Sequence, residues 1–133
     1  MKYHKVCVLS ILLTMTTFAY AENRYENISV ESAKILLDQQ SKGSNITLLD
    51  VRTEREYLQS HIEGAQKIDF YASSFASEIA KLDKSKHYLL YCRTGVRSAK
   101  TLQLMQQLGF EKVYNMQGGI VQWHRQELAI VTQ

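Results

Sequence analysis

Apolar residues recur along the chain in two patterns, which predict different elements. Short uninterrupted runs of branched and aromatic residues are typical of buried strands, whereas apolar residues three or four apart are typical of amphipathic helices. The runs predict strands at residues 25–28, 46–51, 66–69, 88–91 and 112–116. The helical spacing predicts helices at residues 30–40, 97–108 and 120–128, another within 70–82, and a short one starting in the segment 53–56. Because strands and helices alternate, we expect an α/β fold with a mostly parallel central sheet and helices on both faces.

Local signals mark the ends of three of these helices. Ser29 is suited to cap the helix of residues 30–40, and Thr53 with Glu56 forms a capping box. Gly109 is a suitable residue to end the helix of residues 97–108. The intervening segment 61–65 is expected to be a turn.

The strand of residues 88–91 runs directly into a short polar loop that begins with Cys92. A loop between the carboxyl end of a strand and the amino end of a helix is where α/β proteins place ligand sites. Backbone N–H groups, the helix dipole and the charges of Arg93 and Arg97 would all favour a thiolate, which is the nucleophilic form of cysteine. The alternative is that Cys92 is a small buried hydrophobic residue. The cationic, glycine-containing loop favours a reactive cysteine.

The first 21 residues have the pattern of a secretory signal peptide. A basic start with Lys2 and Lys5 precedes an apolar segment at 6–18 that is short for a membrane span, and Ala19-Tyr20-Ala21 is a small-residue cleavage pattern. A retained amino-terminal anchor is the alternative. We expect cleavage after Ala21, one domain at residues 22–133, and a periplasmic protein without a membrane anchor.

Cleavage would change both the charge and the number of cysteines. Loss of the two lysines lowers Lys+Arg from 16 to 14 against 13 acidic residues, so the formal charge falls from +3 to +1. This balance gives no reason to expect a nucleic-acid partner. Cys7 would leave with the signal, and a lone cysteine in an exported protein is an intermolecular partner or a free reactive thiol. Cys92 would be that cysteine.

Three separate segments, in order, resemble the signatures of the rhodanese domain in its single-domain form. They are Asp50-Val51-Arg52 with Glu56-Tyr57 and His61-Ile62-Glu63-Gly64-Ala65, then Cys92-Arg93-Thr94-Gly95-Val96-Arg97-Ser98, then Gly118-Gly119-Ile120 with Trp123. Together they cover essentially all of residues 22–133. One departure is Glu63, where relatives usually carry proline, and it is expected to loosen that turn without touching the chemistry.

The resemblance implies a rhodanese-like fold and a sulfurtransferase without a cofactor. In such enzymes the loop cysteine takes the outer sulfur of a donor such as thiosulfate, releases sulfite and holds the sulfur as a persulfide. An acceptor then removes the sulfur. This acceptor is cyanide or a thiol, and a protein thiol is one candidate. This chemistry needs a nucleophile with a lowered pKa and passes through a covalent intermediate. The residues of the Cys92 loop fit both requirements.

Cys92 is the expected nucleophile, and the other six residues of the loop are expected to bind the substrate: Arg93, Thr94, Gly95, Val96, Arg97 and Ser98. Two roles stay open for Arg97, because a guanidinium can hold an anionic donor or brace the loop by bonding backbone carbonyls. Gly95 would allow a positive φ or a close approach of the ligand. Ser98 could donate to the thiolate, although capping the following helix is the expected role.

The residues expected to have structural roles are Asp50, Arg52, His61, Gly118, Gly119 and Trp123. Cys92, His61 and Asp50 could also form a triad like that of thiol proteases, but a triad is recognised by geometry. The spacing of His87 and His124 does not match a metal site, so both are expected at the surface.

Three rival functions fit less well. Cysteine phosphatases and arsenate reductases place five residues between the cysteine and the arginine of the anion loop, whereas four separate Cys92 from Arg97. A disulfide oxidoreductase would need a second cysteine. Non-catalytic binding modules on the same scaffold typically lack the cysteine that this chain retains.

Overall fold

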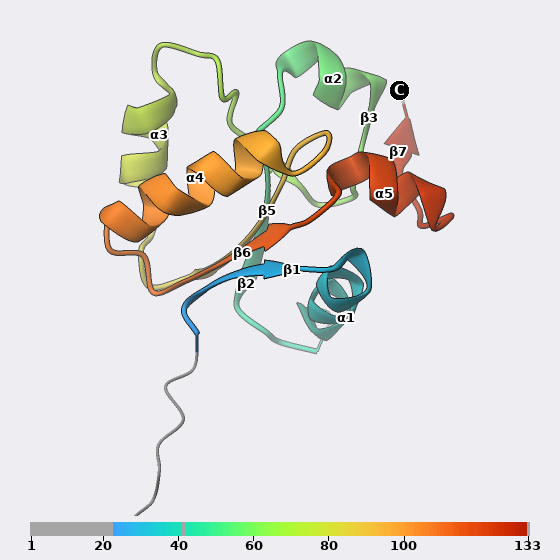
Figure 1. The fold of residues 1–133 in the computed structure, drawn as a ribbon, viewed down its shortest axis with the longest axis horizontal. Coiled ribbons are helices and arrows are strands. Elements are labelled where there is room, and N and C mark those ends of the chain that lie inside the picture. The colour runs from blue at the N-terminus through green and yellow to red at the C-terminus, as the bar shows by residue number, and fades with distance from the viewer. Residues whose placement is uncertain (1–22, 41, 133) are drawn as a thin grey trace, which may run out of the picture.

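A computed structural model describes residues 23–40 and 42–132, and its main feature is a parallel sheet of five strands. The strands are β1 (Tyr25–Ile28), β2 (Ile46–Asp50), β4 (Gln66–Lys67), β5 (His87–Tyr91) and β6 (Lys112–Met116). Their order across the sheet is β1-β6-β5-β2-β4, and every pair of neighbours is parallel (Figure 1). The α/β class and the parallel sheet expected from the sequence are confirmed. The chain that leaves β5, the central strand, carries Cys92.

Helices cover both faces of this sheet. They are α1 (Val30–Gln40), α2 (Glu54–Gln59), α3 (Phe75–Lys81), α4 (Val96–Gln107) and α5 (Gly119–Arg125). Figure 1 shows α1 below the sheet and α3 and α4 above it. The buried side chains agree, since those of α3 and α4 belong to one apolar cluster and those of α1 and α5 to another.

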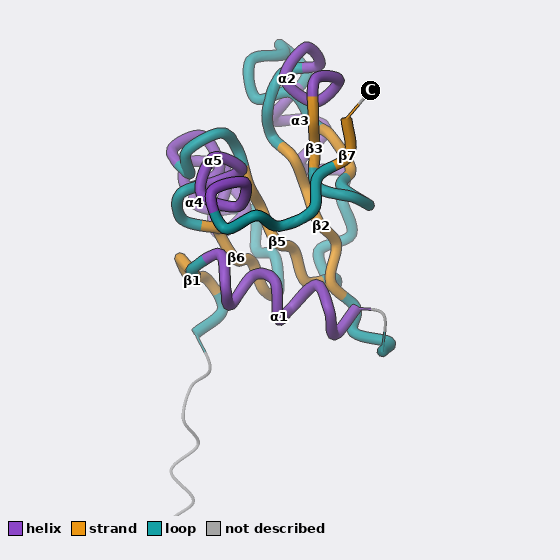
Figure 2. The backbone as a smooth tube through the Cα atoms, turned by 90° about the vertical axis from the view of Figure 1, so that its right-hand side faces the viewer, coloured by secondary structure: helices purple, strands orange, loops and turns teal. Residues whose placement is uncertain are grey.

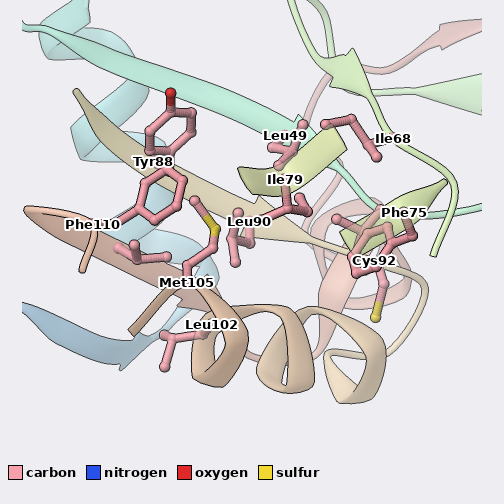
Figure 3. Close-up of a cluster of buried hydrophobic side chains, with 12 residues drawn as sticks. Leu49, Ile68, Phe75, Ile79, Tyr88, Leu90, Cys92, Leu102, Met105 and Phe110 are labelled. Carbon is pink, nitrogen blue, oxygen red and sulfur yellow. The ribbon is translucent and has the colours of Figure 1, made fainter. Parts of the chain in front are cut away.

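The alternation of side chains along β5 decides which face receives the cysteine. Successive residues of a strand point to opposite faces of the sheet. Leu89 and Tyr91 pack in the apolar cluster that contains the buried side chains of α1 and α5. Tyr88, Leu90 and Cys92 therefore pack on the side of α3 and α4 (Figure 3). The alternation along the strand thus decides that the sulfur lies on the face of the sheet covered by α3 and α4.

A second, two-stranded sheet was not predicted from the sequence. β3 (Ser60–His61) and β7 (Val131–Thr132) pair antiparallel, and Figure 2 shows them side by side. Each is only two residues long, too short for a period of two to be recognised. The predicted turn at residues 61–65 therefore begins inside a strand.

Several predicted boundaries need correction. α4 begins at Val96 rather than at about 97, and its N-cap is Gly95, so the expected capping role of Ser98 is wrong. The predicted strand at 66–69 ends at Lys67, whereas the helix predicted within 70–82 is confirmed as Phe75–Lys81. The final helix ends at Arg125 rather than at 128. Helix ends are the part of a helix that periodicity defines least.

The local caps of two other helices are confirmed. The Ser29 hydroxyl accepts a hydrogen bond from the N–H of Ser32 at 3.2 Å, in the first turn of α1. The Thr53 hydroxyl accepts from the N–H of Glu56, while the Glu56 carboxylate accepts from the N–H of Thr53 at 3.0 Å, which completes the capping box of α2. Glu56 of this box has a further partner, Arg97 of α4.

The expected signal peptide, residues 1–21, lies outside the described residues. Among the helices of the described part, none combines the length and the apolar character that crossing a membrane requires.

Candidate active site

Cys92 lies where β5 ends, and its side chain is buried, with a relative exposure of 1%. Its Sγ accepts hydrogen bonds from the N–H of Gly95 at 3.1 Å and from the hydroxyl of Ser98 at 3.4 Å. Figure 3 shows the sulfur pointing away from the other labelled side chains of its cluster. The sulfur therefore ends an apolar layer and faces polar donors.

These donors decide the protonation state of the thiol. Burial raises the pKa of Cys92, but hydrogen bonds outweigh it and leave the pKa below its ordinary value. The opposing bonds come from the Ser98 hydroxyl and from the N–H groups of Ser98, Gly95 and Thr94. Hydrogen bonds to the charged form favour that form, so the loop stabilises a thiolate. Ser98, one of the six loop residues predicted to bind substrate, contacts the nucleophile itself.

The carbonyl groups of the loop are tied to α5. The N–H of Ile120 donates to the Cys92 carbonyl at 3.0 Å, and the N–H of Val121 donates to the Arg93 carbonyl at 3.1 Å. Gly119, the residue before Ile120, has φ +56°, and a Cβ at this position would overlap both carbonyl groups. Because the carbonyls point to α5, the N–H groups of the loop are left to face the sulfur. The sequence marked Gly119 as structural, and this close approach is the reason that the position needs glycine.

Gly95 is the turning point of the loop. Its φ is +99°, and a Cβ there would lie 3.2 Å from the backbone nitrogen of Gly118. Its carbonyl accepts a hydrogen bond from Asn115 Nδ2 at 3.3 Å, and the same nitrogen donates to Asn27 Oδ1 at 2.8 Å. Sequence reasoning missed Asn115. The available signal was a polar side chain between Tyr114 and Met116 in a segment predicted to be a strand.

The two arginines of the loop lie in different surroundings. Arg93 is exposed, and its side chain has no partner among the described residues. Arg97 instead donates to both carboxylate oxygens of Glu56, at 2.7 and 2.8 Å, and its guanidinium lies over the ring of Tyr71. Bonding of backbone carbonyls, one of the two roles left open for Arg97, is replaced by an ion pair with a carboxylate.

This ion pair shifts both groups. The bonds from Arg97 lower the pKa of Glu56 to about 2, against the opposing effect of burial, with further help from Thr53. The same bonds raise the pKa of Arg97. Sequence reasoning used Glu56 only as a cap and a signature residue, because nothing local links it to a residue 41 positions away.

The remaining loop residues lie on its outer side. Thr94 and Val96 are exposed, and with Gly95 they line an open cavity of about 540 Å³ that continues along α4 past Lys100. Of Thr94 and Val96, Thr94 also contributes its backbone N–H, which helps to lower the pKa of Cys92.

Asp50, Arg52 and His61 form contacts at the neighbouring strand ends. Asp50 and Arg52 form a buried ion pair at 2.7 Å, and Arg52 also donates to the Ser60 carbonyl. His61 contacts the Tyr57 carbonyl through Nδ1 at 3.0 Å and stacks on the Tyr57 ring. The hydrogen bonds of the Cys92 sulfur come from its own loop and from α4. The described residues thus show no bonded triad of Cys92, His61 and Asp50.

Gly118 and Trp123 lie at α5. Gly118 is its N-cap with φ +80°, and a Cβ there would lie 2.7 Å from Gln122 Cβ. Trp123 is buried and donates through Nε1 to the Ala129 carbonyl at 3.0 Å. A group of three or more His, Cys, Asp or Glu side chains that could hold a metal is not found within residues 23–40 and 42–132.

Comparison with known proteins identifies a family. The Rhodanese-like domain family matches residues 32–126. A probable adenylyltransferase/sulfurtransferase MoeZ of Mycobacterium tuberculosis is 40% identical over 91 residues, which are 68% of this chain and 23% of MoeZ. This chain therefore spans about a quarter of that relative. The thiosulfate sulfurtransferase GlpE of Actinobacillus pleuropneumoniae is 33% identical over 91 residues, covering 68% of this chain and 82% of GlpE.

Solved structures share the fold. A rhodanese-related protein from Thermoplasma volcanium superposes with a TM-score of 0.67 at 27% identity, covering 80% of this chain and 98% of that protein. A rhodanese-like domain protein from Staphylococcus aureus, at 24% identity, gives a TM-score of 0.63 over 74% of this chain and 90% of that protein. The rhodanese-like fold expected from the sequence is confirmed.

Proposed function

Because the chain belongs to the rhodanese-like domain family, we propose that it is a thiosulfate sulfurtransferase that carries sulfur as a persulfide on Cys92. A polysulfide or a persulfide is the alternative donor. The observation that carries the proposal is the Cys92 sulfur, buried at a strand end and hydrogen-bonded by Gly95 and Ser98. The similarity to GlpE, which is named a thiosulfate sulfurtransferase, supports the choice of donor.

In the first step the Cys92 thiolate attacks the outer sulfur of thiosulfate. A new bond forms between Sγ and that sulfur, the S–S bond of thiosulfate breaks, and its electron pair leaves with sulfite. No proton is transferred, because the thiolate enters and the persulfide leaves the step as an anion. The N–H groups that lower the pKa of Cys92 also stabilise the persulfide anion in their reach. We propose that Arg93, exposed and without a partner in the described residues, holds the anionic donor.

In the second step a thiophile attacks the outer sulfur of the persulfide. Cyanide takes the sulfur as thiocyanate, a thiolate takes it as a new persulfide, and Cys92 leaves as a thiolate. A thiol with a lowered pKa is a better leaving group, so the same hydrogen bonds support both halves of the reaction. Small thiols and a protein thiol are the acceptors that we propose.

A mass spectrum of the reduced protein after exposure to thiosulfate tests this function. The protein should gain the mass of one sulfur atom at Cys92 and release sulfite, and cyanide should restore the starting mass. Cys92→Ser should do neither, because a hydroxyl is far less nucleophilic at neutral pH. If thiosulfate and polysulfide both leave the mass unchanged while the thiol is reduced, the proposed function is wrong. Hydrolysis of an aryl phosphate would point to a phosphatase instead.

We also propose that residues 1–21 direct export and that the domain of residues 22–133 works in the periplasm. The proposal rests on the basic start, the short apolar segment and Ala19-Tyr20-Ala21. Amino-terminal sequencing of the exported protein should begin at Glu22. Recovery of Met1 in a membrane fraction would contradict it.

A further inference from the structure

The carboxylate of Glu56 connects α2 to the start of α4. It accepts four hydrogen bonds, two from the guanidinium of Arg97 and two from the N–H and hydroxyl of Thr53. The Thr53 bonds fix the carboxylate against the first turn of α2, so its position does not depend on Arg97. A carboxylate held in this way accepts a guanidinium in one bidentate geometry. Glu56 therefore decides where the Arg97 side chain lies.

Arg97 lies in the turn of α4 that donates to the reactive sulfur, and its side chain is held away from solvent. It directly precedes Ser98, whose hydroxyl donates to the Cys92 sulfur at 3.4 Å. A charged Cys92 adds to the causes that raise the pKa of Arg97, after the bonds to Glu56. Only 14% of the Arg97 side chain is exposed, whereas Arg93 on the same loop is an exposed residue.

Other charged and titratable groups also lie around the loop, and Lys100 of α4 lines the cavity on its outer side. Tyr71, from the segment between β4 and α3, lies under the Arg97 guanidinium. At the end of β2, the carboxylate of Asp50 is paired with Arg52. α5 approaches the loop with backbone N–H groups. Beside the exposed Arg93 and Lys100, the Glu56–Arg97 pair is thus the partly buried charge arrangement closest in the chain to the donors of the sulfur.

We propose that Glu56 is a positioning residue, which holds Arg97 as a fixed counter-ion of the Cys92 sulfur and leaves Arg93 to bind an anionic donor. The part that concerns the donor rests on the proposed function. The two arginines then have separate roles. Arg97 acts on the thiolate and the persulfide whatever the donor is, and Arg93 acts only when the donor carries negative charge.

The first experiment measures the pKa of Cys92 and needs no sulfur donor. The rate of alkylation by iodoacetamide, a neutral reagent, is followed against pH in the wild type and in Glu56→Gln. An amide has one acceptor oxygen in place of two and turns its NH₂ toward the other guanidinium nitrogen, so we expect Arg97 to swing away and the pKa of Cys92 to rise. Glu54→Gln is the matched control, because it removes the same charge from α2 at a side chain paired with Lys67, and it should not change this pKa.

Both other outcomes overturn the proposal. A lower pKa in Glu56→Gln would show that Glu56 acts only as a negative charge that weakens Arg97. An unchanged pKa would show that the ion pair does not reach the sulfur. Because Glu56 also caps α2, Arg97→Gln serves as a second variant that leaves the capping box intact. It should raise the pKa of Cys92 as well, and Glu56→Gln should add nothing to it in the double variant, since both changes act through one contact.

The second experiment compares donors of different charge, thiosulfate and a neutral organic trisulfide RSSSR. The thiolate attacks the central sulfur of the trisulfide and expels RS⁻, and RS⁻ then attacks the outermost sulfur of the resulting mixed trisulfide, which leaves the Cys92 persulfide and the disulfide RSSR. Arg93→Ala should lower kcat/KM for thiosulfate on the order of ten- to a hundredfold, the value of a charge-assisted contact, and leave the trisulfide almost unaffected. Arg97→Gln should lower kcat/KM for both donors by a similar factor. A loss confined to thiosulfate in Arg97→Gln would show that Arg97 binds the donor. If the proposed function fails, neither donor will transfer sulfur in the wild type, whereas the alkylation result will still stand.

Discussion

The Cys92 loop is held from two sides, and the two sides use different kinds of contact. On the side of α5 the contact is made by backbone, with the N–H groups of Ile120 and Val121 on the carbonyls of Cys92 and Arg93. On the side of α2 the contact is made by two charged side chains, Glu56 and Arg97. Backbone contacts depend on shape, and an ion pair depends on charge and therefore on pH and salt.

This difference suggests a division of work within the site. The α5 side fixes the course of the loop, because Gly119 has no side chain and the two chains approach closely. The α2 side fixes a charge next to a loop whose course is already set. A change on the first side should therefore affect folding and activity together, and a change on the second side should affect the chemistry of the sulfur.

The largest effect is expected for Gly119→Ala. A Cβ would overlap the carbonyls of Cys92 and Arg93, and alanine at φ +56° has a cost of its own. With the two hydrogen bonds to the loop weakened as well, we expect a loss of unfolding free energy on the order of 3 kcal/mol or more, and little sulfur transfer. Urea denaturation and the thiosulfate assay measure both.

Gly109→Ala is the matched control for this prediction. Gly109 also has a positive φ, +79°, but a Cβ there would meet nothing within 4 Å. It should cost only about 1–2 kcal/mol and leave the transfer rate per folded molecule unchanged. Equal effects of the two substitutions would show that the close approach at Gly119 does not hold the loop.

The sequence predicted the parts of the site that are local in the chain. The strand that ends at Cys92 and the Thr53–Glu56 capping box depend on a few neighbouring residues, and both are confirmed. The partners of the loop could not be predicted in this way. Glu56 meets Arg97 across 41 positions, and Asn115 meets Gly95 across 20. Such contacts exist only once the order of strands β2, β5 and β6 is set.

The start of α4 shows the same limit at short range. Apolar spacing predicted the helix, but it did not show that Gly95 would take the N-cap with φ +99° and place Ser98 beneath the sulfur. That geometry follows from the contact between the loop and the segment 116–118. The residue types were therefore recognisable from the sequence, whereas the role of Ser98 required the fold.

A second prediction concerns pH on the α2 side. The folded protein holds the pKa of Glu56 at about 2, below the 4.5 of an ordinary glutamate. A carboxyl with a lowered pKa stabilises the folded state above its unfolded pKa, and this contribution is lost as the pH falls from about 4.5 toward 2. The urea midpoint of the wild type should therefore fall more steeply below pH 5 than that of Glu56→Gln. Parallel curves would show that the ion pair contributes nothing to stability.

The smallest effect is expected for Glu63→Pro, which lies outside both contacts. The N–H of Ala65 donates to the Ile62 carbonyl at 3.1 Å, and Gly64 has φ +78°, as at the third position of a type II turn. Proline is favoured at the second position, where this chain has the exposed Glu63. A compatible proline restricts the unfolded chain, so the substitution should raise the unfolding free energy by about 0.4–1 kcal/mol. Because Glu63 itself is exposed, whereas Ile62 and Ala65 pack in the cluster that includes α5, the substitution should leave those buried residues in place and the pH dependence of Cys92 alkylation as in the wild type. A gain in stability with unchanged alkylation would separate the scaffold from the two contacts that hold the loop, and a changed alkylation profile would show that the turn is coupled to them.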